Sequence, residues 1–175
     1  MIYILVALEP EFPILLDSLG YTLLYTGVGK INATIAAMKA CSDPSCETVI
    51  NYGTAGALNK DIINHLVNIG TVYQRDMDAR PLTHLGYTPF EEDSGPIKIS
   101  DSPYTLSTGD NFVKGMPEIV TDAVDMEAYA IAKVCKIYGK KFECYKYMTD
   151  FADENASEHW QENMHKGAEK FLEIL

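Results

Sequence analysis

Short apolar runs alternate with segments of helical periodicity along this chain, and this alternation is the strongest constraint on its fold. The expected strands cover residues 2–8, 21–25, 47–52, 66–73, 104–107 and 142–148. The expected helices cover residues 12–19, a stretch through 34–40, 126–138 and 157–175. Strands alternating with helices, with polar residues gathered at the strand ends, predict an α/β domain whose site lies at the carboxyl edge of the sheet.

Two acidic residues, Asp125 and Glu127, stand at the start of one predicted helix. Apolar residues at helical spacing continue to residue 138, and Gly139 can end the helix in the left-handed conformation. The stripe consists of Met126, Ala130, Val134 and Ile137. A helix N-terminus favours a carboxylate such as that of Glu127 by about 0.3–1 kcal/mol. A helix-capping role and a role in a site are therefore both open for Glu127.

The composition favours a soluble domain that binds neither nucleic acid nor membrane. The chain has 175 residues, enough for one domain with its own core, and we expect residues 1–175 to form one. Its net charge is −11, from 14 basic and 25 acidic residues, and no basic stripe is present to neutralise phosphates. The apolar run at residues 2–8 is too short to cross a bilayer and follows no basic residues, so we expect neither a signal peptide nor an anchor.

The cysteines and histidines do not have the spacing of a metal site. The four cysteines form no CxxC pair, and the four histidines do not cluster with them. We therefore expect reduced, buried thiols in a cytoplasmic protein, with no metal and no other cofactor.

Two glycine-containing segments could receive a ligand. Gly27 and Gly29 lie between an expected strand and a helix, where backbone N–H groups can bind phosphate or another anion. Asn32 stands where a dinucleotide fingerprint has a third glycine, so a simple tight turn is the alternative. Small residues at 53–57 would let a ligand approach the backbone, or would only serve a turn. Residues 81–97 form a long, turn-rich segment of the kind that is often functional or interfacial.

Six short segments occur in the order typical of one family. They are residues 7–11 (ALEPE), 27–33 (GVGKINA), 51–56 (NYGTAG), 107–112 (STGDNF), 124–128 (VDMEA) and 148–153 (MTDFAD). Together they resemble the nucleoside phosphorylase/nucleosidase superfamily, and within it most nearly the methylthioadenosine/S-adenosylhomocysteine nucleosidases. No single segment is specific, but six in order make a chance similarity improbable. The resemblance implies one three-layer domain, with a central mixed twisted sheet flanked by helices.

The resemblance also implies roles for individual residues in hydrolysis of a purine nucleoside. Glu11 matches the carboxylate that orients or deprotonates the attacking water, and Thr54 matches a hydroxyl residue beside that water. Glu127 matches the carboxylate that binds the ribose hydroxyls, and Met126 packs on the sugar. Asp150 matches the acid that protonates N7 of the leaving purine. This assignment is chemically sensible, because cleavage builds positive charge on the sugar and negative charge on the base.

The implied base site contains Phe112, which would stack on the purine, and Val113, whose backbone would read its edge. The remaining implied substrate contacts are Ala55, Gly56, Asp125 and Thr149. Simpler interpretations remain for several of these residues: Phe112 could be core filling, Asp150 a strand-end cap and Glu11 a solvated acid.

Water is favoured over phosphate as the nucleophile. Phosphorylases of the superfamily hold phosphate with arginines, one of them just before the small-residue segment, where this chain has Asn51 and Tyr52. The only arginines are Arg75 and Arg80, and Lys30 resembles the hydrolases. A phosphate-dependent phosphorylase remains the alternative enzyme.

The chain departs from the methylthioadenosine enzymes in several places. The hairpin expected between Glu11 and Gly27 is missing, residues 75–82 differ, Asp125 replaces Glu, and Lys146 replaces Arg. The missing hairpin leaves a non-catalytic nucleoside-binding relative as a further alternative. The 5′ substituent of the substrate is open, and we expect a homodimer in which residues 85–90 of a partner subunit read it.

Overall fold

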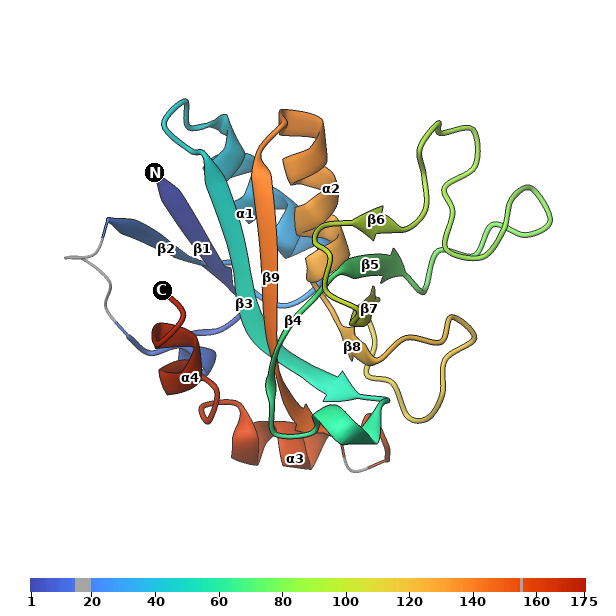
Figure 1. The fold of residues 1–175 in the computed structure, drawn as a ribbon. Helices are drawn as coiled ribbons and strands as arrows, with labels where there is room; N and C mark the ends of the chain where they lie inside the picture. The colour runs from blue at the N-terminus through green and yellow to red at the C-terminus, as the bar shows by residue number, and fades with distance from the viewer. Residues whose placement is uncertain (15–19, 155) are drawn as a thin grey trace.

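The computed structural model describes residues 1–14, 20–154 and 156–175, and Figure 1 shows a twisted sheet with helices on both faces. The sheet runs in the order β2 (Tyr21–Tyr25), β1 (Ile2–Val6), β3 (Thr48–Ala57), β8 (Ala123–Asp125), β7 (Thr105–Thr108), β5 (Thr71–Gln74) and β6 (Ile97–Lys98). Off this path, β9 (Lys141–Asp150) pairs with β3 and with β4 (Leu66–Asn68). The expected α/β class with a central mixed sheet is confirmed.

The parallel pairing of the central strands determines where the site can lie. Strands β1, β3 and β9 are parallel, with β3 between the other two. Their carboxyl ends therefore meet at one edge of the sheet, as ligand sites in α/β sheets require. Strand β8 approaches the same edge from the other direction, because it pairs antiparallel with the end of β3.

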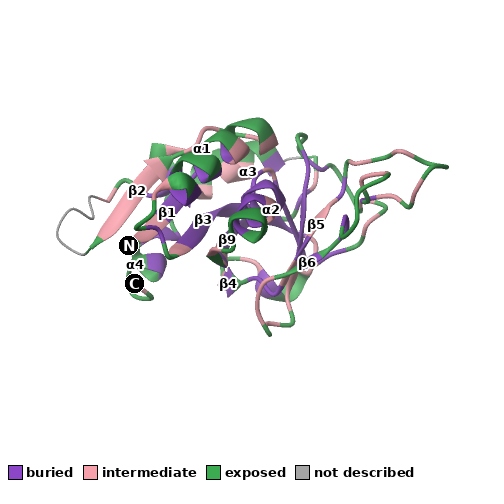
Figure 2. Ribbon diagram, turned by 90° about the horizontal axis from the view of Figure 1, so that it is seen from above, coloured by how far each residue is buried: buried purple, intermediate pink, exposed green. Residues whose placement is uncertain are grey.

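Alternating side chains of the central strands supply a core on each face of the sheet. Leu5 and Val49 belong to the cluster formed with α1 (Lys30–Ser42) and α2 (Ala128–Tyr138). Ile4 and Ile50, one position away, belong to the cluster that includes Phe171 of α4 (Ala168–Leu172). Strands buried on both faces give the three-layer arrangement, whose buried centre is visible from above in Figure 2.

Helix α2 ends where its sequence predicts, but its apolar stripe is shorter. Gly139 follows the last turn with a φ of 63°, the left-handed conformation that favours glycine. Ala130 and Val134 are buried as expected, whereas Ile137 is 72% exposed and the expectation for it was wrong. The buried side of α2 therefore ends before its last turn.

Three expected strand boundaries were wrong. β1 ends at Val6 rather than at residue 8, and β3 continues through residues 53–57, which were expected to follow the strand. The single strand expected over 66–73 is divided at Gly70 between β4 and β5, which pair with different neighbours. A side chain at Gly70 would meet the carbonyl oxygen of Ser102 at 1.8 Å, so the chain can pass there only as glycine.

The single helix expected over 157–175 is two helices, α3 (Ala156–Asn163) and α4. Gly167 lies at the break, and a Cβ there would meet Tyr147 Cβ at 2.5 Å and Tyr52 Oη at 2.6 Å. The chain packs closely against β3 and β9 at Gly167 and changes direction there, and Phe171 of the second helix lies in the core. A helix was also expected over 12–19; residues 12–14 are not helical, and 15–19 lie outside the described residues. In the part of the chain that the structure describes, no helix is long and apolar enough to cross a membrane.

Substitution of Gly167 by Ala should lower the free energy of unfolding by about 1–3 kcal/mol, because the added methyl overpacks a closed contact. Urea denaturation measures this change. Glu169→Ala, on the exposed side of α4, is the matched control and should stay within about 0.5 kcal/mol of the parent. Equal stability of Gly167→Ala and the parent would contradict this account of the break.

Candidate active site

A cavity of about 280 Å³ opens at the carboxyl edge of the sheet, where β1, β3, β8 and β9 converge. Its carboxylates come from Glu11, Asp125, Glu127 and Asp150. Its other lining residues are Ala7, Leu8, Val28, Thr54, Ala55, Gly56, Arg75, Asn111, Phe112, Val113, Val124, Met126, Ala152, Ala156 and Trp160. All but one of the residues expected in the site line this cavity; Thr149 is the exception.

Glu11 follows β1 in a short 3-10 turn (Glu9–Glu11), and it is 3% exposed. Its Oε1 accepts from Thr54 N at 3.0 Å and from Thr54 Oγ1 at 2.7 Å, while its Oε2 accepts from Leu8 N at 3.0 Å. Strand β3 and the turn after β1 thus hold this carboxylate in one orientation. The simple interpretation of Glu11 as a solvated acid was wrong.

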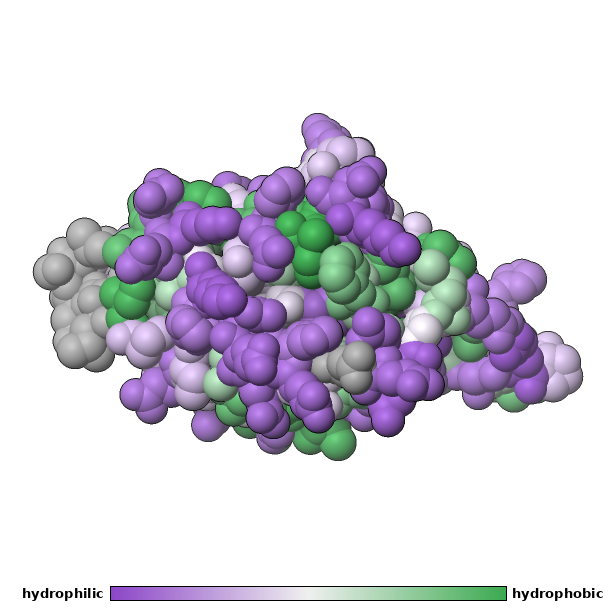
Figure 3. Space-filling model, turned by 90° about the horizontal axis from the view of Figure 1, so that it is seen from below, coloured by the Kyte–Doolittle hydropathy of each residue, from purple (hydrophilic) through white to green (hydrophobic). Residues whose placement is uncertain are grey.

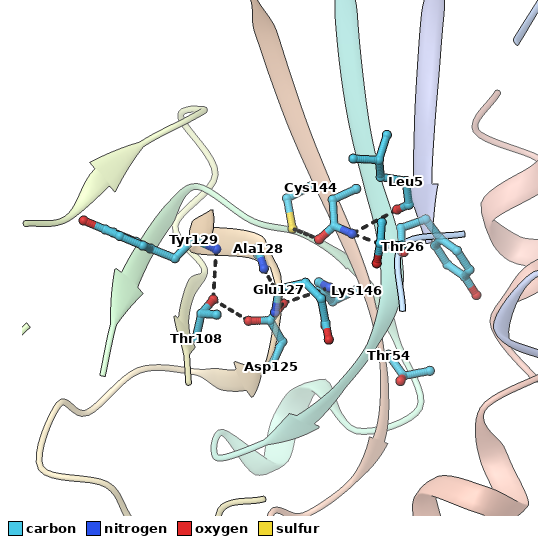
Figure 4. Close-up of polar contacts among 12 residues, drawn as sticks. Leu5, Thr26, Thr54, Thr108, Asp125, Glu127, Ala128, Tyr129, Cys144 and Lys146 are labelled. Carbon is cyan, nitrogen blue, oxygen red and sulfur yellow. Dashed lines mark hydrogen bonds and ion pairs between the residues drawn. The ribbon is translucent and has the colours of Figure 1, made fainter. Parts of the chain in front are cut away.

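A buried ion pair joins β9 to the end of β8. Lys146 Nζ lies 3.0 Å from Asp125 Oδ2, and both side chains are almost fully buried (Figure 4). Asp125 also accepts from Thr108 Oγ1 at 2.5 Å and from the backbone N–H groups of Glu127 and Ala128. Burial by itself raises the pKa of Asp125, but the Lys146 ammonium and these hydrogen bonds outweigh it and lower the pKa.

Asp125 therefore caps α2, and Glu127 does not. Glu127 occupies the N-cap position without a side-chain capping bond, and its Oε1 accepts from Gly29 N at 2.9 Å instead. Burial and the neighbouring Asp125 charge raise the pKa of Glu127 to about 7. Of the two roles left open by the sequence, capping falls to Asp125, which leaves Glu127 directed toward the cavity.

Asp150 is the last residue of β9 and lines the same cavity as Glu11. Its Oδ1 accepts from Ala152 N at 2.9 Å, and its Oδ2 accepts from Thr149 Oγ1 at 2.8 Å. Burial raises the pKa of Asp150, which favours the protonated acid. Thr149 thus acts on the site through Asp150 rather than by lining the cavity.

An apolar wall completes the cavity. Val113 packs with Val124 and Ala152, and Phe112 is 48% exposed with its ring 6.2 Å from that of Trp160. The exposure rules out the interpretation of Phe112 as core filling. The expected helix over 157–175 included Trp160 on its inner face, but its place in the cavity was not anticipated.

The glycine turn receives anions, and both come from this chain. Gly29 N donates to Glu127, and Lys30 N donates to Asp110 Oδ1 at 2.8 Å. Lys30 Nζ also pairs with Asp76 at 2.6 Å. The turn therefore ties the start of α1 to the start of α2, and these carboxylates occupy the N–H groups that a phosphate would use.

Arg75 and Lys146 are the charged residues whose positions the sequence did not reveal. Arg75 donates to the backbone carbonyls of Ser107, Asp125, Gly109 and Asn111, and so holds the loop that carries Phe112. Arg75 directly follows β5 and Lys146 lies within β9, but only the packing of distant strands shows which buried partner each residue meets.

Buried carboxylates that line one small, largely apolar cavity at the carboxyl edge of this sheet are typical of an enzyme active site for a small molecule. The chain belongs to the phosphorylase superfamily, whose family model matches residues 15–108 and 92–175.

Individual relatives agree with this assignment. The chain is 29% identical to aminodeoxyfutalosine nucleosidase of Helicobacter pylori, over 86% of this chain and 77% of that one. It is 26% identical to the 5′-methylthioadenosine/S-adenosylhomocysteine nucleosidase of a Marinomonas species, over 84% and 75%. The crystal structure of the Helicobacter pylori 5′-methylthioadenosine/S-adenosylhomocysteine nucleosidase has a TM-score of 0.87 at 24% identity, over 99% of this chain and 96% of that one. The fold expected from the resemblance is confirmed.

The raised pKa of Glu127 makes stability depend on pH. Between its ordinary value near 4.5 and about 7, the unfolded chain has released this proton while the folded chain retains it. Stability therefore falls as pH rises through this window. Glu127→Gln keeps an acceptor for Gly29 N and has no buried carboxyl to ionise. Its free energy of unfolding, relative to that of the parent, should therefore rise by on the order of 2–3 kcal/mol between pH 4.5 and pH 8.

Urea denaturation of both proteins at several pH values measures this difference. Glu143→Gln, on β9 far from the cavity lining, serves as the control. A stability difference between Glu127→Gln and the parent that is constant from pH 4.5 to pH 8 would contradict the retained proton.

Proposed function

We propose that this chain is a purine nucleosidase that hydrolyses the N-glycosidic bond of an adenine nucleoside such as methylthioadenosine or S-adenosylhomocysteine. The observation that carries the proposal is the meeting of Glu11, Glu127 and Asp150 in one cavity, although they are far apart in the sequence. Water would attack C1′ while N7 of the purine takes up a proton. Three carboxylates in one small apolar space are costly unless the ligand brings complementary charge and hydrogen bonds.

The arrangement supports a division of labour along the scissile bond. Asp150, with its raised pKa, supplies a proton to N7 as negative charge develops on the base. Glu127 binds the ribose hydroxyls and faces the positive charge that develops on the sugar, with Met126 packed on the ring. Glu11 Oε2 accepts one hydrogen bond, from Leu8 N, among the described residues, and it can accept the proton of an attacking water.

The base would lie against the apolar wall, with Phe112 stacked on it and the backbone of Val113 at its edge. Ala55, Gly56 and Asp125 complete the contacts around the sugar and base. A side chain at Gly56 would meet Asp150 Oδ1 at 2.8 Å, so glycine leaves the acid room beside the ligand. Thr149 supports Asp150 from outside the cavity.

Hydrolysis is favoured over phosphorolysis because the chain's own groups take up the candidate phosphate contacts. Carboxylates accept from the N–H groups of the glycine turn, and backbone carbonyls accept from the Arg75 guanidinium. Arg80 pairs with Asp78 and Glu118 at the surface. Adenine release should therefore be independent of phosphate.

Incubation with methylthioadenosine, S-adenosylhomocysteine, aminodeoxyfutalosine, adenosine and inosine, followed by chromatography for free base, tests the reaction. Asp150→Asn should lower kcat by about 10²–10⁴ because the general acid is lost. Its melting temperature should stay nearly unchanged, because Asn still accepts from Ala152 N. No base released from any substrate would contradict the proposal, and release that requires phosphate would identify a phosphorylase.

We further propose that residues 1–175 act as one cytoplasmic domain and pair as a homodimer. Helix α1 exposes Ile31, Ile35 and Met38, at 75%, 51% and 46%, on one side. Val28, just before this helix, lines the cavity. Residues 85–90 do not line the cavity of their own chain, and Phe90 is 97% exposed. A second copy on this side would cover the apolar stripe and could bring its loop to the 5′ end of the nucleoside.

Ile35→Glu should convert the dimer to a monomer, because it places a charge in the covered stripe. Light scattering after size-exclusion chromatography measures the mass. Glu169→Lys, exposed on α4 at the other face of the sheet, is the control and should remain dimeric. A monomeric parent protein at about 50 µM, roughly the scale at which weak dimers form, would rule out the pairing.

A further inference from the structure

Three side chains from distant parts of the chain form a directed series of hydrogen bonds that ends on Glu11. Trp160 Nε1, on α3, donates to Thr54 Oγ1 at 2.8 Å. The Thr54 hydroxyl, on β3, lies 2.7 Å from Glu11 Oε1 and donates to it. The series runs from the helix over the cavity to the carboxylate beside the proposed water.

The indole fixes the direction of this series. An indole N–H can only donate, so the Thr54 oxygen must accept from Trp160. The single hydroxyl proton of Thr54 is then free for Glu11 Oε1, which also accepts from Thr54 N at 3.0 Å. Two donors on Oε1 and one on Oε2 make the two oxygens inequivalent, and they leave Oε2 the better acceptor for a water proton.

Helix α3, which carries Trp160, contacts the site both near Glu11 and near Asp150. Ala156 and Trp160 line the cavity, and Asn163 Nδ2 donates to Thr149 O at 2.9 Å, beside Asp150. Seen from below in Figure 3, apolar side chains lie exposed in the middle of the mostly polar face on which α3 lies. Helix α3 therefore contacts the site at two places. Trp160 bonds to Thr54 beside Glu11, and Asn163 bonds to the residue before Asp150.

We propose that Trp160 is a positioning residue for Glu11: through Thr54 it determines which carboxylate oxygen faces the attacking water. This inference rests on the proposed nucleosidase function, in which Glu11 acts on that water. A role for Trp160 only in packing is the competing explanation, because its ring also borders Phe112. Phe in place of Trp separates the two, since it keeps an aromatic ring and removes the N–H.

Kinetics of Trp160→Phe on whichever nucleoside the protein cleaves provide the first test. We expect kcat to fall about tenfold, a fraction of the full contribution of a general base, and KM to change by less than about twofold. Thr54→Val should cause a similar loss, Thr54→Ser should restore the parent rate, and Trp160→Phe should add nothing to Thr54→Val. Parent kinetics for Trp160→Phe, or additive losses in the double variant, would overturn the proposal.

Nuclear magnetic resonance of the indole provides a second test that needs no turnover. Trp160 is the only tryptophan, so ¹⁵N-labelled protein gives one indole N–H signal to follow. Glu11→Gln should shift this signal in the parent protein and leave it unmoved in a Thr54→Val background, because the hydroxyl carries the effect. Thr34→Val, whose lost hydroxyl bonds only the Lys30 carbonyl of its own helix, is the matched control and should not shift the signal.

The two tests distinguish the failures. A protein that cleaves no nucleoside but shows the coupled indole signal would lack the proposed function and keep the hydrogen-bond series. If Glu11→Gln does not change the chemical shift of the Trp160 indole N–H in the parent protein, the proposed role of Trp160 is overturned, whatever the protein cleaves.

Discussion

The buried ion pair between Lys146 and Asp125 is the interaction on which the rest of the site depends. It joins the middle of β9 to the end of β8, and through Asp125 it caps α2. Because Asp125 satisfies the first N–H groups of that helix, the carboxylate of Glu127 is free to face the cavity. Removing either partner of such a pair leaves an uncompensated buried charge, which typically costs about 3–5 kcal/mol. Arrangement of the site and stability of the fold therefore rest on the same contact.

The carboxylates of Glu11 and Asp150 are both held by hydrogen bonds from backbone N–H and threonine hydroxyl groups. Glu11 is held by Thr54 and Leu8, and Asp150 by Ala152 and Thr149. Such contacts fix orientation without a formal positive charge beside the acid. That difference lets burial raise the pKa of Asp150 while the pKa of Asp125, beside Lys146, is lowered. Opposite environments on one sheet edge suit carboxylates for different parts of a reaction.

Much of the fold followed from local patterns, and two of the failures, the breaks near Gly70 and Gly167, share one cause. The strand at residues 21–25 and the end of α2 at Gly139 were predicted because local apolar spacing and a left-handed glycine specify them. The division of residues 66–73 and the break at Gly167 were missed because both depend on a distant segment. Ser102 at one place, and Tyr52 and Tyr147 at the other, leave room only for glycine.

The sequence by itself determined the class of fold and singled out three acids that line one cavity, because strand periodicity is local and six ordered segments carried the family resemblance. Only the tertiary structure decided which carboxylate caps α2, that Lys146 neutralises it, and that Trp160 reaches Thr54. The cap joins residues only three positions apart, but the other two contacts join residues 21 and 106 positions apart. Sequence spacing cannot show such contacts, because they exist only once the packed sheet brings its strand ends together and excludes water from between them.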